Sequence, residues 1–153
     1  MRRTILGLVV ALWSTPVSAM CFEEAGARYG IEPDLLKAIG WVESRWRQVT
    51  AGNTDGSRDI CLMQVNSWWL PKLEPHGIGE AELMGDACLC VNVGAWILAQ
   101  EVASVGYTWK AAAQYHSRTP RHQQRYVAAV REALRSIRVA KGSAASELKD
   151  GRE

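Results

Sequence analysis

The sequence has little net charge, few histidines and no C-x-x-C motif. Its 18 lysine and arginine residues are nearly balanced by 16 acidic ones, which gives a net charge of +2 over 153 residues. A general binder of nucleic acid carries a large positive excess, so we expect no nucleic-acid partner. The three histidines are scattered along the chain, which argues against a zinc site. We therefore expect neither a metal nor an organic cofactor.

The N-terminus has the three parts of a secretory signal. Arg2 and Arg3 form a basic start, residues 5–13 are apolar, and residues 17–19 form a small-x-small cleavage site. The apolar run is too short to cross a bilayer as a helix, and we expect no other segment to span a membrane. A signal peptide over 1–19, removed at about Ala19, predicts a periplasmic protein. The alternative is a buried N-terminal helix.

Four cysteines in an exported chain indicate two disulfides. Cys88 and Cys90 lie two positions apart in a predicted helix, where they point to different faces. They are therefore poor partners for each other. Cys21 and Cys61 must then pair with Cys88 and Cys90, and the spacing leaves both ways of doing so open.

Apolar residues recur with helical spacing in several segments that turn-forming residues separate. Leu35, Ile39 and Val42 have this period in a helix whose first turn holds Pro33. Gly30 and Gly106 follow the last periodic residues of two other segments, as glycine does at helix ends. The predicted helices span 21–29, 33 to about 46, 87 to about 105, 108–117 and 119 to about 139.

Three segments lack this spacing. Residues 49–59 are rich in turn formers and predict a loop or small hairpin. Residues 70–86 contain prolines and glycines and predict an irregular stretch, while 140–153 are polar and predict a disordered tail. We therefore expect one monomeric, mainly α domain over 20–139, with a small loop or hairpin excursion at about 49–66.

Glu43 is the first candidate for chemistry. It lies four positions after Ile39 and three before Trp46, on or beside the apolar stripe of its helix. A carboxyl that is removed from water, near the negative end of a helix dipole, keeps its proton more readily. A protonated carboxyl is what a general acid for glycosidic cleavage requires. The alternative is a stripe-edge glutamate that bends to solvent or pairs with Arg45 or Arg47.

Asp59 is a candidate second carboxylate, because a helix end followed by a hairpin can bring it to the other side of one cleft. Asp55 is assigned to a turn, since it precedes Gly56. Carboxylates on both sides of a glycosidic bond are the usual equipment for hydrolysis. Four further residues carry amides or flat rings suited to sugars: Gln64, Asn66, Trp68 and Trp69.

Three short motifs resemble those of the soluble lytic transglycosylase family. They are Val42-Glu43-Ser44, the run Leu-Met-Gln-Val-Asn-Ser at 62–67, and Ala113-Gln114-Tyr115. The span 21–137 resembles the small secreted branch that accompanies type III and type IV secretion and conjugation machines. Residues 53–67 also resemble animal-type lysozymes, in which the second aspartate of this run, here Asp59, is the second catalytic carboxylate.

The resemblance implies a lysozyme-like fold and a role for several residues. Glu43 would be the acid and then the base, giving a 1,6-anhydro end on a peptidoglycan strand. Gln64 would line the cleft, and Tyr115 would donate a hydrogen bond that orients Glu43. His116 replaces the asparagine of the third motif, so we expect a sugar contact with altered pH dependence. A hydrolase that uses Asp59, and an inactive peptidoglycan-binding adaptor, are the rival functions.

The resemblance also implies the disulfide pairing. Cys21 and Cys88 match the usual pair of the secreted branch. Cys61 and Cys90 are departures from the family pattern, and Cys61 stands where the second motif has glycine. We therefore predict a Cys61–Cys90 bridge, with a free thiol in the cleft as the alternative.

Overall fold

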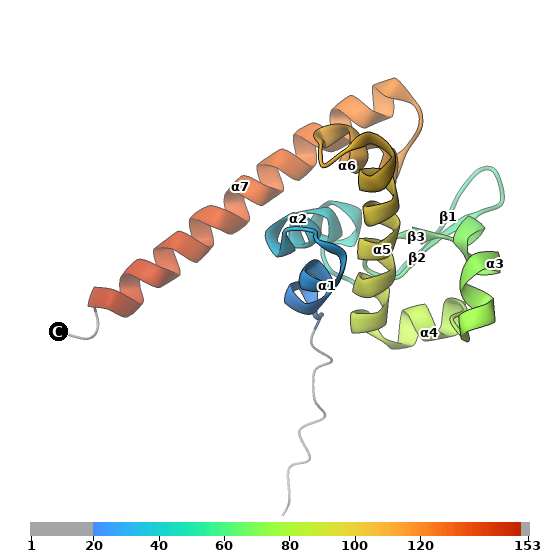
Figure 1. Cartoon of the computed structure of the whole chain (residues 1–153), viewed down its shortest axis with the longest axis horizontal. Coiled ribbons are helices and arrows are strands. Elements are labelled where there is room, and N and C mark those ends of the chain that lie inside the picture. Colours follow the sequence, from blue (N-terminus) through green and yellow to red (C-terminus); the bar gives the residue numbers. More distant parts are fainter. Residues whose placement is uncertain (1–19, 151–153) are drawn as a thin grey trace, which may run out of the picture.

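The computed structural model describes residues 20–150, with side chains described as far as residue 145, so the predicted signal peptide lies outside the described residues. Figure 1 shows helices packed around a central helix, with a small sheet at one side. The mainly helical, lysozyme-like architecture that the sequence predicts is confirmed. The helices are α1 (Phe22–Tyr29), α2 (Pro33–Ser44), α3 (Leu70–Leu73), α4 (Glu80–Gly85), α5 (Ala87–Val105), α6 (Trp109–His116) and α7 (Pro120–Asp150), with 3-10 turns η1 (Ser67–Trp69) and η2 (Glu74–His76).

The central helix α5 contacts α1, α2, α4, α6 and the sheet (Figure 1). Its mean hydropathy reaches 1.5, which makes it long and apolar enough to cross a membrane by composition alone. We expected no segment beyond the signal peptide to be long and apolar enough to span a membrane, and α5 differs from this expectation. The physical reason is its central place, since Val91, Ala95 and Leu98 are buried against neighbouring elements. A core helix with neighbours on several sides is apolar around much of its circumference.

The sheet has three short antiparallel strands, β1 (Thr50–Gly52), β2 (Arg58–Ile60) and β3 (Val65–Asn66), in the order β1-β2-β3. Its position confirms the predicted hairpin at about 49–66. Asp59 of β2 lies opposite Asn66 of β3, and Ile60 lies opposite Val65. Because side chains alternate along a strand, Asp59 and Asn66 share one face while the two apolar side chains are buried on the other.

Two segments are more ordered than the sequence predicts. Residues 70–86 contain α3, η2 and α4, because Pro71 and Pro75 occupy the first turns of α3 and η2, where proline is tolerated. Residues 140–150 continue α7, where a disordered tail is predicted. Beyond α2, with which it packs, the red end of α7 extends away from the other helices (Figure 1).

Both predicted disulfides are confirmed. Cys21 is bonded to Cys88, which ties the start of α1 to α5. Cys61 is bonded to Cys90, and both of these residues are fully buried. Two bridges over 20–150 fit an extracytoplasmic protein, because disulfides persist in oxidising compartments.

Candidate active site

A polar cavity of about 290 Å³ lies where α2, the sheet, α5, α6 and the start of α7 meet. We call it the cleft. It is lined by both candidate carboxylates, Glu43 and Asp59, together with most of the predicted sugar-binding residues: Gln64, Asn66, Trp69, Tyr115 and His116. Trp68 is the predicted residue that does not line it, and that side chain is 72% exposed.

Glu43 reaches the cleft because α2 ends directly after it. The sequence predicts this helix to about Trp46, whereas it ends at Ser44. Arg45 and Trp46 both have φ of +58°, the left-handed conformation that stops a helix. The amide of Trp46 then donates to the Gly40 carbonyl at 3.3 Å, which closes the helix end. The Glu43 side chain is left with 11% exposure, at the negative end of the helix.

Residues 64–66 form one wall of the cleft, and the buried dipeptide Leu62-Met63 directly before them has backbone groups that need partners. Each of its four polar atoms receives one side chain. The Leu62 amide donates to Gln48 Oε1 at 2.8 Å, and its carbonyl accepts from Ser44 Oγ at 2.8 Å. The Met63 amide donates to Cys90 Sγ at 3.3 Å, and its carbonyl accepts from the Tyr115 hydroxyl at 2.8 Å. Buried backbone groups require this kind of pairing, so these side chains hold the wall in place.

Tyr115 is therefore used differently from the expectation. The resemblance implies a hydrogen bond to Glu43, but the hydroxyl proton is donated to the Met63 carbonyl. Burial is the main cause of the raised pKa of Tyr115, and the charge of the nearby Glu43 raises it further. Tyr115 thus joins α6 to the wall beside Glu43. Gln48 has no motif to mark it, and sequence reasoning did not identify it.

Cys61 and Gln64 bracket this dipeptide, and both have positive φ, +63° and +50°. Glycine adopts such a conformation freely, whereas other residues are strained in it. This is a physical reason for glycine at the position of Cys61 in the family motif. Here the bond to Cys90 ties the strained residue to α5. Gly94 lets α5 approach closely, since a Cβ there would lie 2.8–2.9 Å from Met63 atoms.

Asp59 is held by amide groups on both of its oxygens. Asn53 Nδ2 donates to one oxygen at 3.0 Å, and Asn66 Nδ2 donates to the other at 2.9 Å. Asn66 also donates to Ser57 Oγ and accepts from the Trp68 amide. The side-chain donors of Asn66 are therefore engaged within the wall.

Gln64 is in the same situation, because its Nε2 donates to the carbonyls of Val49 and Cys61. Its Oε1 has no hydrogen bond among the described residues. Asp55 accepts from the amide and hydroxyl of Ser57, so it forms the turn that the sequence indicates. The Ser57 hydroxyl and then its amide lower the pKa of Asp55.

His116 lies at the opening of the cleft, next to the candidate acid. Its Nδ1 is 3.7 Å from Glu43 Oε1, and its ring stacks on that of Tyr126 at 4.3 Å with planes 1° apart. Contact with the Glu43 carboxylate raises the pKa of His116, while burial opposes this and the Asp59 charge adds to it. Burial, and then the Glu43 charge, raise the pKa of Tyr126.

Tyr126 is a residue near the site that sequence reasoning missed. It lies on α7 and is 5% exposed, so in the sequence it looks like part of an apolar helix stripe that continues with Val130. No described residue lies within normal hydrogen-bonding distance of its hydroxyl, but the Glu43 carboxylate is near enough to act as a weak acceptor, which adds to the raised pKa of Tyr126. A buried phenol close to a carboxylate and under an imidazole is a contact that only the fold reveals.

The tryptophans of the η1 turn separate in the fold. Trp69 lines the cleft and packs against Trp96, with ring centroids 5.4 Å apart in an edge-to-face arrangement. Trp68 points to solvent from the same turn. The sequence therefore places one aromatic face in the cleft and leaves the other outside it.

Two other features were weighed as sites. A groove of about 700 Å³ lies between α2 and α7, lined largely by apolar side chains such as Trp41, Trp46 and Ile137. Although it is larger than the cleft, it holds only one carboxylate, Glu132, and one cation, Arg45, which stacks on Trp41. The pair of carboxylates needed for glycosidic chemistry is in the cleft, so we place the site there.

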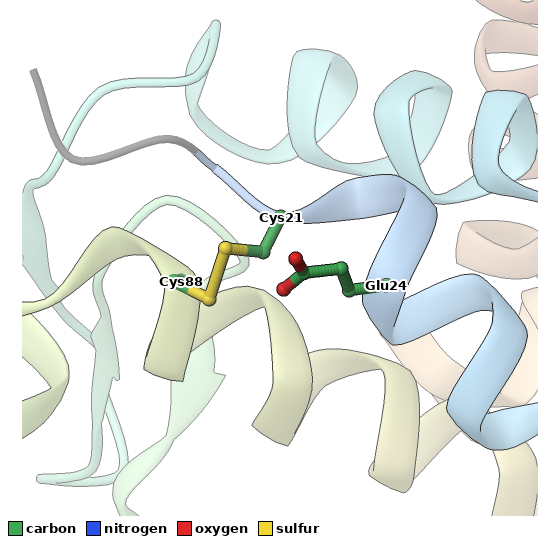
Figure 2. A group of neighbouring side chains, drawn as sticks. All are labelled: Cys21, Glu24 and Cys88. Atoms are coloured by element: carbon green, nitrogen blue, oxygen red, sulfur yellow. A yellow bond between two sulfur atoms is a disulfide. The ribbon is translucent and has the colours of Figure 1, made fainter.

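Figure 2 shows the second feature, Glu24 beside the Cys21–Cys88 bridge. The ligand atoms of these three residues lie within 4.8 Å of one another, as in a metal site. Both sulfur atoms are joined in the disulfide, however, and a metal binds the thiolate. The cluster is therefore a disulfide with a neighbouring carboxylate.

Comparison with known proteins supports the sequence resemblance. Residues 20–135 match the family described as Transglycosylase SLT domain. The chain is 35% identical over 147 residues to "Invasion protein IagB" of Salmonella typhimurium, covering 91% of this chain and 90% of that protein. It is 38% identical over 122 residues to "X polypeptide" of Escherichia coli, covering 77% and 72%. It is 36% identical over 108 residues to "Peptidoglycan-binding-like protein" of Escherichia coli O157:H7, covering 65% of each.

The matched region contains all the residues that line the cleft, from Glu43 at the end of α2 to His122 at the start of α7. The family model therefore covers the whole segment that builds the cleft. The chain belongs to the Transglycosylase SLT domain family.

Proposed function

We propose that this protein is a lytic transglycosylase that cleaves the β-1,4 bond between N-acetylmuramic acid and N-acetylglucosamine in peptidoglycan. Protonated Glu43 donates to the leaving glycosidic oxygen as that bond breaks. The resulting carboxylate accepts the proton of the muramic 6-hydroxyl, whose oxygen bonds to the anomeric carbon. The strand then ends in 1,6-anhydromuramic acid, no water is consumed, and Glu43 regains its proton.

The proposal rests on the position of Glu43. Its side chain is 11% exposed, at the end of α2, and it opens on a cleft with the polar surface that a sugar needs. Partial removal from water strengthens each charge interaction in the cleft.

Asp59 is placed to act electrostatically on the sugar. Both of its oxygens accept amide hydrogen bonds, which hold the carboxylate in position on the cleft wall. A fixed carboxylate can stabilise positive charge that develops on the sugar ring. Each oxygen has a second lone pair, so the same geometry also suits the second candidate function.

A lysozyme-type muramidase is the second candidate, because Asp59 does line the same cavity as Glu43. In that reaction Asp59 would support a glycosyl intermediate or activate water. The two reactions leave different ends on the glycan, which makes them chemically distinguishable.

Analysis of the released muropeptides by mass spectrometry tests the proposal. Wild-type protein should release fragments with 1,6-anhydro ends, and reducing ends would identify a hydrolase instead. Glu43→Gln should lower the rate of release by about 10²- to 10⁴-fold, because glutamine cannot transfer the proton. Asp59→Asn should retain much more activity than Glu43→Gln. Equal losses in the two variants would favour the two-carboxylate muramidase.

The same variant separates an enzyme from an inactive peptidoglycan-binding adaptor. For a cleaving enzyme, Glu43→Gln should still sediment with purified peptidoglycan while release of fragments is lost. An adaptor predicts that wild-type protein releases nothing and that Glu43→Gln supports the cellular function fully.

We further propose that the protein acts in the periplasm and opens the wall locally for a secretion or conjugation apparatus. The predicted leader, two disulfides and similarity to a protein named for invasion support this role. N-terminal sequencing of the exported protein should begin at Met20. A chromosomal Glu43→Gln replacement should impair assembly of the apparatus. Normal assembly in this strain would show that assembly does not require the cleavage activity.

A further inference from the structure

A further cavity, of about 470 Å³ and with both polar and apolar lining residues, lies between α1, α3, η2 and α5. We call it the side cavity. The residues that matter for its chemistry are Arg28, Lys72, His76, Asp86, Asn92 and Trp96. None of these residues lines the cleft, and the proposed reaction does not use them.

A tryptophan pair separates the side cavity from the cleft. Trp69 lines the cleft, and its ring meets that of Trp96, which lines the side cavity, at 5.4 Å. Lys72, on the rim of the side cavity, has its Nζ 4.8 Å from the ring of Trp69. A ligand in the cleft and a ligand in the side cavity would therefore lie on opposite sides of the Trp69–Trp96 ring pair.

The side cavity carries charges of both signs. Arg28 and Lys72 are exposed, and neither has a carboxylate within ion-pair distance in the part of the chain whose side chains the structure describes. Asp86 is also exposed, and one of its oxygens caps α5 by accepting from the Leu89 amide. Glu24 lies beside Cys88 at the same end of α5 (Figure 2). Two cations and one carboxylate therefore line the side cavity, with Glu24 near one end of it.

The cavity also contains an acceptor without a donor. Asn92 Nδ2 donates to the Cys88 carbonyl at 3.0 Å. Its Oδ1 is buried and has no hydrogen-bond partner among the described residues. Buried acceptors are nearly always paired, so this oxygen keeps hydrogen-bonding capacity that the described residues do not use.

We propose that the side cavity binds the peptide of a peptidoglycan strand while the cleft holds the sugars. This inference depends on the proposed function, because it names the part of the same substrate that lies beyond the cleft. Wall peptides begin at the lactyl group of muramic acid, so they leave the strand directly beside the sugar ring. They carry several carboxylates for Arg28 and Lys72, and an amine for Asp86. A polymer with charges of only one sign fits this mixed set less well.

A titration with the peptide alone tests binding. The probe is a synthetic tetrapeptide of L-alanine, γ-linked D-glutamate, diaminopimelate and D-alanine, observed through the indole N–H signals of the protein. We expect the Trp96 signal to shift. Arg28→Gln and Lys72→Gln should each weaken binding by about threefold, the usual size for an exposed ion pair. Lys110→Gln on α6, outside both cavities, is the matched control and should leave binding unchanged.

The proposal is overturned if the indole signal does not respond, or if both variants bind the peptide as tightly as wild type. Arg28→Gln is the cleaner variant, because Arg28 does not touch Trp69. Amidating the peptide carboxylates should weaken binding to wild type. It should have little further effect on a double variant that combines Arg28→Gln and Lys72→Gln. An equal loss of affinity in wild type and the double variant would also contradict pairing of the peptide carboxylates with Arg28 and Lys72.

Cleavage kinetics connect the side cavity to the reaction. Strands that keep their peptides should have a lower KM than strands stripped by an amidase. Arg28→Gln should raise KM for intact strands and leave kcat and cleavage of stripped strands unchanged. If wild type has equal KM for both substrates, the side cavity has no role although the proposed function stands. If neither substrate is cleaved, the proposed function fails, while the peptide titration still decides the fate of the side cavity.

Discussion

The imidazole Nδ1 of His116 lies 3.7 Å from Glu43 Oε1, at the outer limit of an ion pair. The ring is fixed from below by parallel stacking on Tyr126. The other titratable groups that line the cleft are Asp55, Asp59, Tyr115 and His122. The residue that departs from the third family motif is thus in contact with the candidate acid, and not only placed to meet a sugar.

The titration of His116 should report this contact. Glu43→Gln removes the carboxylate that is the main cause of the raised pKa of His116, so the pKa should fall toward its ordinary value. Two-dimensional NMR of the imidazole C–H signals measures it. Glu132→Gln, which removes a carboxylate outside the cleft, is the control and should have no effect. An unchanged pKa in Glu43→Gln would show that the two groups are not coupled in solution.

Stability should depend on pH through the same pair. A histidine whose folded-state pKa is raised contributes stability fully below its unfolded value of about 6.5, and loses it as pH rises through the folded value. The difference in unfolding free energy between wild type and His116→Asn should therefore shrink as pH rises from about 6.5 through the raised pKa of the folded state. Urea unfolding across this range measures the difference. A difference that grows with pH would contradict the sign of the shift.

The left-handed conformation of Cys61 predicts an unusual ranking of substitutions. In a Cys90→Ala background, which lacks the bridge, Cys61→Gly should be more stable than Cys61→Ala by about 1 kcal/mol, because glycine is unstrained at positive φ. Both variants should be less stable than wild type by about 3 kcal/mol, as expected for loss of a disulfide. Thermal unfolding gives the order. An alanine variant as stable as the glycine variant would show that the turn relaxes once the bridge is absent.

Two buried tyrosines should respond differently to loss of their hydroxyls. Tyr115→Phe leaves the buried Met63 carbonyl without its donor and should cost about 1–3 kcal/mol. Tyr126→Phe removes a hydroxyl whose acceptor, the Glu43 carboxylate, lies beyond normal hydrogen-bonding distance, so the loss of stability should be smaller than for Tyr115→Phe. Chemical denaturation compares the two. A larger loss for Tyr126→Phe would mean that its hydroxyl is hydrogen-bonded in solution.

Features with a local signature were predictable from the sequence. The bounds of α5 follow from an apolar run that stops at Gly106, and the hairpin follows from its turn residues. The sequence does not predict α3 and η2, because proline usually breaks a helix, whereas Pro71 and Pro75 each lie in a first turn. Proline is tolerated in the first turn of a helix and breaks the helix further along, and composition does not show which of these positions a proline occupies.

Hydrogen-bond partners were the part of the site that the sequence could not supply. Asn66 and Gln64 have the chemistry to bind sugars, but their amide donors are engaged within the wall. Tyr115 finds its acceptor 52 positions away, and Gln48 meets Leu62 across a turn that no motif describes. A side chain with several acceptors in reach bonds to the one that the fold brings closest, and this depends on packing over the whole domain.

The length of α7 has a practical consequence for handling the protein. Its 31 residues correspond to about 46 Å of helix, at about 1.5 Å per residue. In Figure 1 its end lies on the opposite side of the molecule from the sheet that forms one wall of the cleft. A bead, dye or affinity matrix attached near this end of α7 would therefore face away from the cleft. The protein could be immobilised in this way and still present its cleft to intact peptidoglycan.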